Sequence, residues 1–238
     1  MTGKIFKFGM KSKRWLFWIG IILASAVMFL LGVAMTLGGE KEGPDPDLHV
    51  FLAVMMCIIT VGAAVARVTP MLNLTLGMNR SRRSFLKAMT GLLAVLSLLA
   101  GSITLWGNVI MNKISPENFD LHTMLSLTGV DNGFCTGMPG LLISWAFEIF
   151  FFFSVVLCAM GIMGLFYKIP PRVGMVLWFA GIIGFNALIW FGDDLKIGMP
   201  SGMAARLAMM IGALVTGAIL SIYCYGSCDL RGTLQESN

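Results

Sequence analysis

The sequence predicts an all-α, polytopic membrane protein with six transmembrane helices, and three observations lead to this fold class. Of the 238 residues, 57% are hydrophobic and only 12% are charged, whereas roughly a quarter of the residues in an ordinary soluble domain are charged. The mean hydropathy is +0.84. Six apolar runs each approach the ~20 residues that a helix needs to cross a bilayer, and together they use about half of the chain. We therefore expect a single transmembrane domain over residues 1–238, with no separate soluble domain.

The amino-terminal residues 1–14 are predicted to form a short interfacial helix. Apolar residues alternate there with five lysine or arginine residues. One side of such a helix can lie in the headgroup layer while its basic side meets anionic lipid. The apolar run that follows, residues 15–37, is longer than the apolar region of a cleavable signal peptide. It is therefore expected to be the first span.

The next part of the chain is expected to cross the membrane twice more. The connector 38–49 is acidic and rich in turn-forming residues, which favours an external location. Residues 50–66 return the chain to the inside, where the basic segment 67–87 precedes a third span at 88–110. The long polar connector 111–137 is expected to lie outside, as a small cap or short helix over the bundle.

Three further spans, at 138–166, 173–191 and 203–225, complete the predicted bundle. The turn between the first two of these contains Pro170 and Pro171, which end one helix and space it from the next. With this topology, 13 of the 17 basic residues lie on one side of the membrane. Because cytoplasmic loops carry an excess of lysine and arginine, both termini are expected in the cytoplasm.

The basic segment 67–87 has the most informative sequence between two spans. It holds five basic residues and no acidic residue, which indicates a cytoplasmic location. Pro70 can begin a short helix, and Gly77 followed by Asn79 ends it. Ser81 or Asn79 can then cap the helix that enters the next span. A short helix at the membrane surface is suited to docking on a soluble partner, whereas charge alone favours a loop that only sets topology.

The order of residues in this segment, L-T-L-G-M-N-R-S-R-R-S-F, resembles a motif that follows the second span in small bacterial permeases of the type-2 ABC-transporter family. Over the whole chain, the resemblance extends to the six spans, the basic amphipathic amino terminus and the lack of a nucleotide-binding domain. The matching residues are Leu76, Gly77, Met78, Asn79, Arg80, Arg82, Arg83 and Phe85.

This resemblance implies a permease subunit in the bacterial cytoplasmic membrane, in contact with membrane lipids. It implies export of a peptide, a lipid-linked molecule or an amphiphile. Its partners would be a second permease subunit, in a homo- or heterodimer, and a separate ATPase subunit that binds ATP and Mg²⁺. The basic segment would then act as a coupling helix that docks on the ATPase. The expected coupling residues are Leu74, Leu76, Gly77, Arg80, Arg82 and Arg83.

The chain itself lacks the residues for ATP chemistry or a metal site. No G-x-x-x-x-G-K-[ST] sequence is present, so a phosphate-binding loop is excluded and neither enzyme activity nor a cofactor is expected in this chain. His49 and His122 have no neighbouring residues at metal-ligand spacing, and Cys224 with Cys228 supplies only half of a zinc site. The basic residues flank spans instead of gathering on a soluble surface, which argues against nucleic-acid binding.

Three polar residues within or near the predicted spans are candidates for an intramembrane site. Glu148 is the one carboxylate well inside a span, where a charged side chain is costly and usually faces the bundle interior. Arg206 lies near the outer end of the sixth span and can reach Glu148 only if one side chain extends. Asn186 lies in the fifth span. The sequence favours a helix-packing contact or a protonated acid at Glu148, and a substrate site is the alternative.

Two other function classes remain compatible with the sequence. A scaffold or immunity protein of the membrane, with no transport activity of its own, needs the same spans and the same charge distribution. A secondary transporter is less well supported, because the spans contain few ionisable residues for ion coupling and show no inverted repeat with broken helices.

Overall fold

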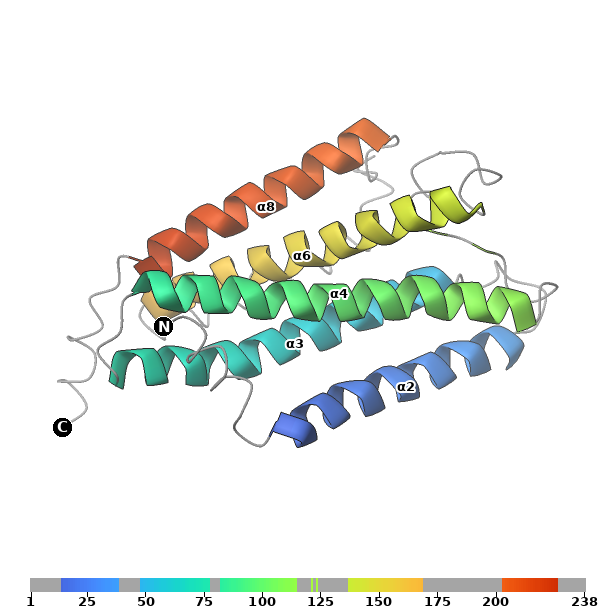
Figure 1. The fold of residues 1–238 in the computed structure, drawn as a ribbon, viewed down its shortest axis with the longest axis horizontal. Coiled ribbons are helices and arrows are strands. Elements are labelled where there is room, and N and C mark those ends of the chain that lie inside the picture. The colour runs from blue at the N-terminus through green and yellow to red at the C-terminus, as the bar shows by residue number, and fades with distance from the viewer. Residues whose placement is uncertain are drawn as a thin grey trace, which may run out of the picture.

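The computed structural model describes residues 14–38, 48–77, 82–114, 121, 123, 137–168 and 203–226. All regular structure within these ranges is helical, and they contain no strand, so the all-α class is confirmed. The helices are α2 (Arg14–Gly38), α3 (Leu48–Gly77), α4 (Arg82–Ile114), α6 (Met138–Lys168) and α8 (Met203–Gly226) (Figure 1).

Four of these helices are long and apolar enough to cross a membrane, which indicates a membrane protein. Their apolar stretches are Phe51–Val68, Arg83–Ile114, Met138–Leu165 and Leu207–Tyr225. They match the second, third, fourth and sixth predicted spans. In α2 the apolar stretch is shorter, at Ile19–Leu31.

Several sequence predictions fall on parts of the chain outside the described residues. These parts are the interfacial helix up to residue 13, the fifth span at 173–191 and most of the connector 111–137. The start of that connector is described, and there α4 continues to Ile114 instead of ending at residue 110.

The largest difference from the sequence prediction lies in α3. We expected the second span to end at Ala66 and a separate helix to begin at Pro70, but one helix runs through both positions to Gly77. A proline inside a helix costs about 3 kcal/mol because a backbone hydrogen bond is lost. Val68 and Met71, on either side of Pro70, are almost completely buried. Their packing provides the tertiary stabilisation that keeps the helix continuous.

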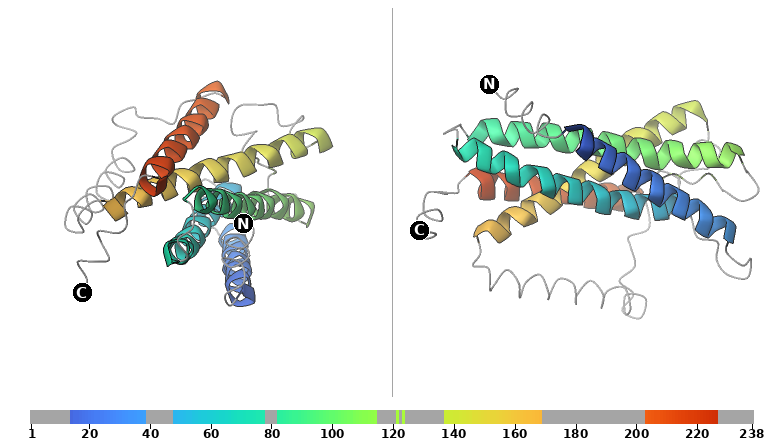
Figure 2. Two further views of the ribbon diagram at one scale, coloured as in Figure 1. Left: turned by 60° about the vertical axis from the view of Figure 1, so that its left-hand side comes forward. Right: turned by 90° about the horizontal axis from the view of Figure 1, so that it is seen from below.

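The helices form a bundle in which α3, α4 and α6 are central and α2 and α8 lie at opposite edges (Figures 1 and 2). α4 packs against both α3 and α6, and α8 packs mainly against α6. The edge helices expose large apolar side chains, such as Leu30 of α2 at 66% and Ile219 of α8 at 61%. Such surfaces suit contact with lipid or with another membrane helix.

Consecutive described helices run antiparallel except for the last pair. Contacts between α6 and α8 pair Gly161 with Gly217 and Gly164 with Cys224, so the residue numbers rise together along both helices. α6 and α8 are therefore parallel, as Figure 1 also shows. This arrangement agrees with the parallel direction expected for the fourth and sixth spans.

Candidate coupling segment and intramembrane polar seam

The basic segment lies where α3 ends and α4 begins. Leu74, Leu76 and Gly77 belong to the last turns of α3, and Arg82 is the first residue of α4. The side chains of Leu74, Leu76 and Arg82 are not among those described, and Arg80 lies outside the described residues. Of the described basic side chains here, Arg67 is half-buried, whereas Arg83 and Lys87 are exposed. The exposed pair places positive charge at this end of the bundle.

A buried aromatic contact ties the start of α4 to the ends of α6 and α8. Phe85 is 1% exposed, and its ring packs on that of Tyr225, with centroids 5.6 Å apart and an interplanar angle of 58°. The Tyr225 hydroxyl donates a hydrogen bond to the carbonyl oxygen of Met160 at 3.1 Å. Met71 of α3 belongs to the same buried apolar cluster. The two helices that flank the basic segment are thus packed firmly against α6 and α8.

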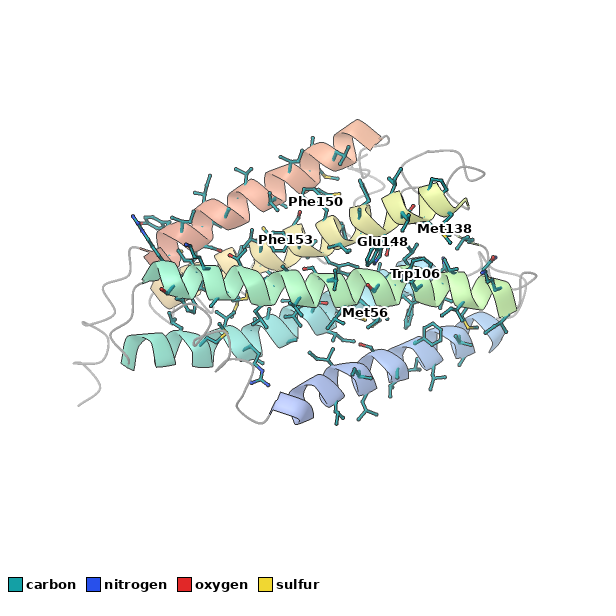
Figure 3. The ribbon with its side chains drawn as sticks, in the orientation of Figure 1. Met56, Trp106, Met138, Glu148, Phe150 and Phe153 are labelled. Carbon is teal, nitrogen blue, oxygen red and sulfur yellow. The ribbon has the colours of Figure 1, made fainter. Side chains whose placement is uncertain are left out.

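Within the bundle, Glu148 lies on α6 where that helix crosses α4 (Figure 3). Its side chain is fully buried, at 0% exposure. The helices approach closely at this point: a Cβ atom added to Gly101 of α4 would lie 3.0 Å from the backbone nitrogen of Ile149 and 3.3 Å from the carbonyl carbon of Glu148. Glycine therefore brings the α4 backbone against the part of α6 that carries the carboxyl group.

Buried polar side chains continue along the contact between α4 and α6. We call this contact the polar seam. The hydroxyls of Ser97 and Thr104 donate hydrogen bonds to carbonyls of their own helix, at 2.8 Å and 3.0 Å. Hydroxyls bonded in this way remain satisfied inside an apolar bundle. The fully buried polar residues of the seam are Ser97, Thr104 and Asn108 of α4 and Ser144 and Glu148 of α6.

Two hydrogen bonds connect α6 to neighbouring segments beside the polar seam. The indole nitrogen of Trp145 donates to the Ser102 hydroxyl of α4 at 3.0 Å. The Ser144 hydroxyl donates to the hydroxyl of Thr123, in the connector, at 3.3 Å. Both donors lie within about one helical turn of Glu148. The seam near the carboxyl group is therefore closed partly by polar contacts between neighbouring segments.

Sequence reasoning identified Glu148 but missed its polar surroundings on α4. The available signal was spacing, because Ser97, Thr104 and Asn108 recur at intervals of seven and four residues, which places them on one face of a helix. This periodic polar face lies within a long apolar run.

The described part of the structure gives no contact between Glu148 and the other two intramembrane candidates, Asn186 and Arg206. Asn186 lies outside the described residues, and Arg206 is in the first turn of α8 with its side chain not described. Glu148 lies on the side of α6 that meets α4. At about 100° per residue, this is roughly opposite the side on which Gly161 and Gly164 meet α8. The Glu148–Arg206 pair stays a prediction, and the direction of Glu148 argues against it.

Among the described residues, no group of three histidine, cysteine or acidic side chains could hold a metal ion. Cys57, Cys158 and Cys224 are free thiols. Cys224 is buried and its Cβ atom lies close to Gly164, so this cysteine packs at the contact between α6 and α8.

Comparison with protein-family models, curated proteins and solved structures found no match. The similarity to type-2 ABC-transporter permeases therefore remains an interpretation of the basic segment and the span pattern.

Proposed function

We propose that this chain is the membrane-spanning permease subunit of a bacterial ABC exporter. It has six spans, both termini lie in the cytoplasm, and the basic segment 67–87 docks on a separate ATPase subunit. The substrate is a peptide, a lipid-linked molecule or an amphiphile. A second permease subunit completes the transport path. ATP and Mg²⁺ bind to the ATPase, since the phosphate-binding loop is missing from this sequence.

The parallel arrangement of α6 and α8 supports six spans. When two parallel membrane helices follow one another, the chain between them has to return across the membrane. The apolar run 173–191 lies in this interval and is long enough for a membrane helix. With α2 and the run 173–191 included, the chain crosses the membrane six times. Because this number is even, both termini lie on the same side. The distribution of basic residues favours the cytoplasm.

The length of α3 supports a position of the basic segment outside the hydrocarbon layer. With 30 residues, this helix is about 45 Å long, whereas the hydrocarbon core of a bilayer is about 30 Å thick. The apolar stretch of α3 ends at Val68. The turns that carry Leu74 and Leu76 therefore extend beyond it, next to the exposed Arg83 and Lys87.

The observation that carries the proposal is the contact between Phe85 and Tyr225, which anchors the start of α4 where the basic segment ends. A topology signal needs only charge and has no need of a fixed shape. Here the rings of Phe85 and Tyr225 pack together, and Tyr225 in turn bonds to the Met160 carbonyl on α6. A force applied to the basic segment would thus reach the transmembrane helices α6 and α8 directly. This is the mechanical property that a coupling element requires.

Charge-preserving substitutions separate coupling from topology. Arg80→Lys and Arg82→Lys keep the positive charge but lose the planar group that can hold a carboxylate with two hydrogen bonds. Leu76→Asp places a charge in the proposed contact surface. We expect all three variants to insert normally but to lose ATPase association and transport, with Leu76→Asp affected most.

The experiment combines recovery of the ATPase from detergent extracts with a transport or resistance assay and an insertion control. Lys113→Arg, at the exposed outer end of α4, is the matched charge-preserving control and should behave like wild type. If every variant inserts, binds the ATPase and transports like wild type, the segment only sets topology. That result would remove the sequence-specific support for an ABC permease, whereas a wild-type chain that neither binds an ATPase nor transports would favour a non-transporting scaffold or immunity protein.

A further inference from the structure

We infer that the polar seam between α4 and α6 is a binding site for lipophilic organic cations, with Glu148 as the carboxylate that recognises the positive charge. This inference names a substrate class and so rests on the proposed transport function. Glu148 is the sole acidic residue in the part of the chain that the structure describes. It lies ten residues into α6, which is about 15 Å along the helix and close to the middle of a bilayer.

Aromatic residues flank Glu148 along α6 and occur on the neighbouring helix α4. Trp145 precedes it by about one turn, and Phe152, which is fully buried, follows by about one turn. Trp106 lies on the neighbouring helix α4 (Figure 3). Aromatic faces attract organic cations, and the attraction strengthens where water is excluded. A carboxylate among aromatic side chains within a membrane is thus suited to a guest that is both positively charged and apolar.

The polar seam is closed in this structure, and its contacts explain how it can open for a guest. The hydroxyls of Ser97 and Thr104 bond to their own helix, so separating α4 from α6 breaks neither bond. The two bonds between segments, Trp145 to Ser102 and Ser144 to Thr123, join neutral polar groups. Water or a polar ligand group can replace such bonds at little cost. Opening the seam therefore keeps the hydrogen bonds of Ser97 and Thr104 and exchanges those of Trp145 and Ser144 for bonds to water or to the ligand.

The competing explanation is that Glu148 is a neutral carboxylic acid that serves only helix packing. Glu148→Gln distinguishes the two roles, because glutamine keeps the shape and the hydrogen-bonding capacity but cannot carry a negative charge. A packing role predicts that this variant behaves like wild type. A cation-binding role predicts that it loses affinity for cations.

The experiment measures binding of radiolabelled tetraphenylphosphonium to the purified full-length chain in nanodiscs, with empty nanodiscs as background. Wild type should bind it saturably, and Glu148→Gln should lower the affinity by about tenfold or more. Glu148→Asp retains the charge and should still bind tetraphenylphosphonium saturably. This variant keeps the test valid if the glutamine variant fails to fold. Ser25→Ala removes a buried hydroxyl of α2 outside the seam and should bind like wild type.

Charge selectivity is tested with tetraphenylborate, an anion of similar size, which should not compete for the site. Equal binding by wild type and Glu148→Gln, equal competition by the anion, or no saturable binding by wild type would each overturn the inference. ATPase association of the wild-type chain is measured in parallel. If association is present without cation binding, this inference fails and the proposed function stands. If the chain binds cations but does not associate with the ATPase, the proposed function fails and this inference stands.

Discussion

The two faces of α6 form helix contacts of different kinds. Toward α8, glycines bring the backbones together: a Cβ atom added to Gly217 would lie 2.6 Å from the backbone nitrogen of Cys158, and one added to Gly161 would lie 2.9 Å from the Gly217 carbonyl oxygen. Toward α4, the contact is less tight at Gly101, and buried polar side chains lie along it. We therefore expect α6 and α8 to move as one unit and the bundle to separate at the polar seam.

The largest expected effect comes from filling the contact between α6 and α8. Gly217→Ala forces the backbones apart, because the new methyl group meets backbone atoms of Cys158 at 2.6 and 2.7 Å, and these cannot move unless the helix shifts. We expect a loss of stability on the order of 3 kcal/mol, measured as the unfolding free energy in detergent. Gly212→Ala is the matched control on the same helix, since nothing lies within 4 Å of its added Cβ atom. Equal losses in the two variants would contradict the close backbone contact.

A smaller effect is expected from the same substitution in the polar seam. In Gly101→Ala the nearest contacts are at 3.0 Å and 3.1 Å, to the backbone nitrogen and Cγ1 of Ile149. A shift of a few tenths of an ångström relieves them, so we expect a loss of about 1 kcal/mol. A larger loss for Gly101→Ala than for Gly217→Ala in the same unfolding assay would contradict this assignment. The contact between α4 and α6 would then be the tighter one, and the contact between α6 and α8 the one that can separate.

Tyr225→Phe tests the anchor of the basic segment. The variant keeps the ring contact with Phe85 but loses the hydrogen bond to Met160. A buried hydrogen bond contributes about 1 kcal/mol to stability. The proposed coupling role predicts that transport per ATP hydrolysed falls while ATPase association is retained, which reconstituted vesicles can measure. An unchanged ratio of transport to hydrolysis would show that Tyr225 has only a structural role.

The smallest effect is expected at the hydrogen bond across the polar seam. Trp145→Phe removes the donor to Ser102 and keeps an aromatic ring. Hydrogen bonds between membrane helices contribute about 0.6 kcal/mol on average, so thermal stability should change little. Because the bond helps to close the seam, its loss should increase the access of a water-soluble maleimide to a cysteine placed at Thr104. No increase would indicate that other contacts keep the seam closed.

The sequence predicted the described helices well because hydropathy alone decides which segments can cross a bilayer. The predicted span 138–166 corresponds to α6 at Met138–Lys168, and 203–225 corresponds to α8 at Met203–Gly226. The predicted end of α3 was wrong. The rule that proline ends a helix considers only the neighbouring residues in sequence. The burial of Val68 and Met71 depends on contacts with residues distant in sequence.

The candidate site was predicted less completely than the fold. Glu148 was identifiable because an acid inside an apolar run is rare. The roles of Gly101 and Gly217 could not be assigned, because a glycine has no side chain to show which neighbour its helix face meets. That assignment needs the positions of α4 and α8 around α6. The contact between Phe85 of α4 and Tyr225 of α8 joins residues far apart in sequence, and no local pattern indicates such a pair.

ATP-driven opening between α4 and α6 is tested by distances measured across both faces of α6 during ATP turnover. Spin labels are placed on exposed positions in a chain lacking its five native cysteines: Ile110 with Leu142 across the polar seam, and Ile162 with Ile219 across the contact with α8. With the partner ATPase in vesicles, ATP should change the distance between the first pair and leave the second unchanged. A fixed first distance, or a change confined to the second pair, would contradict ATP-driven opening between α4 and α6.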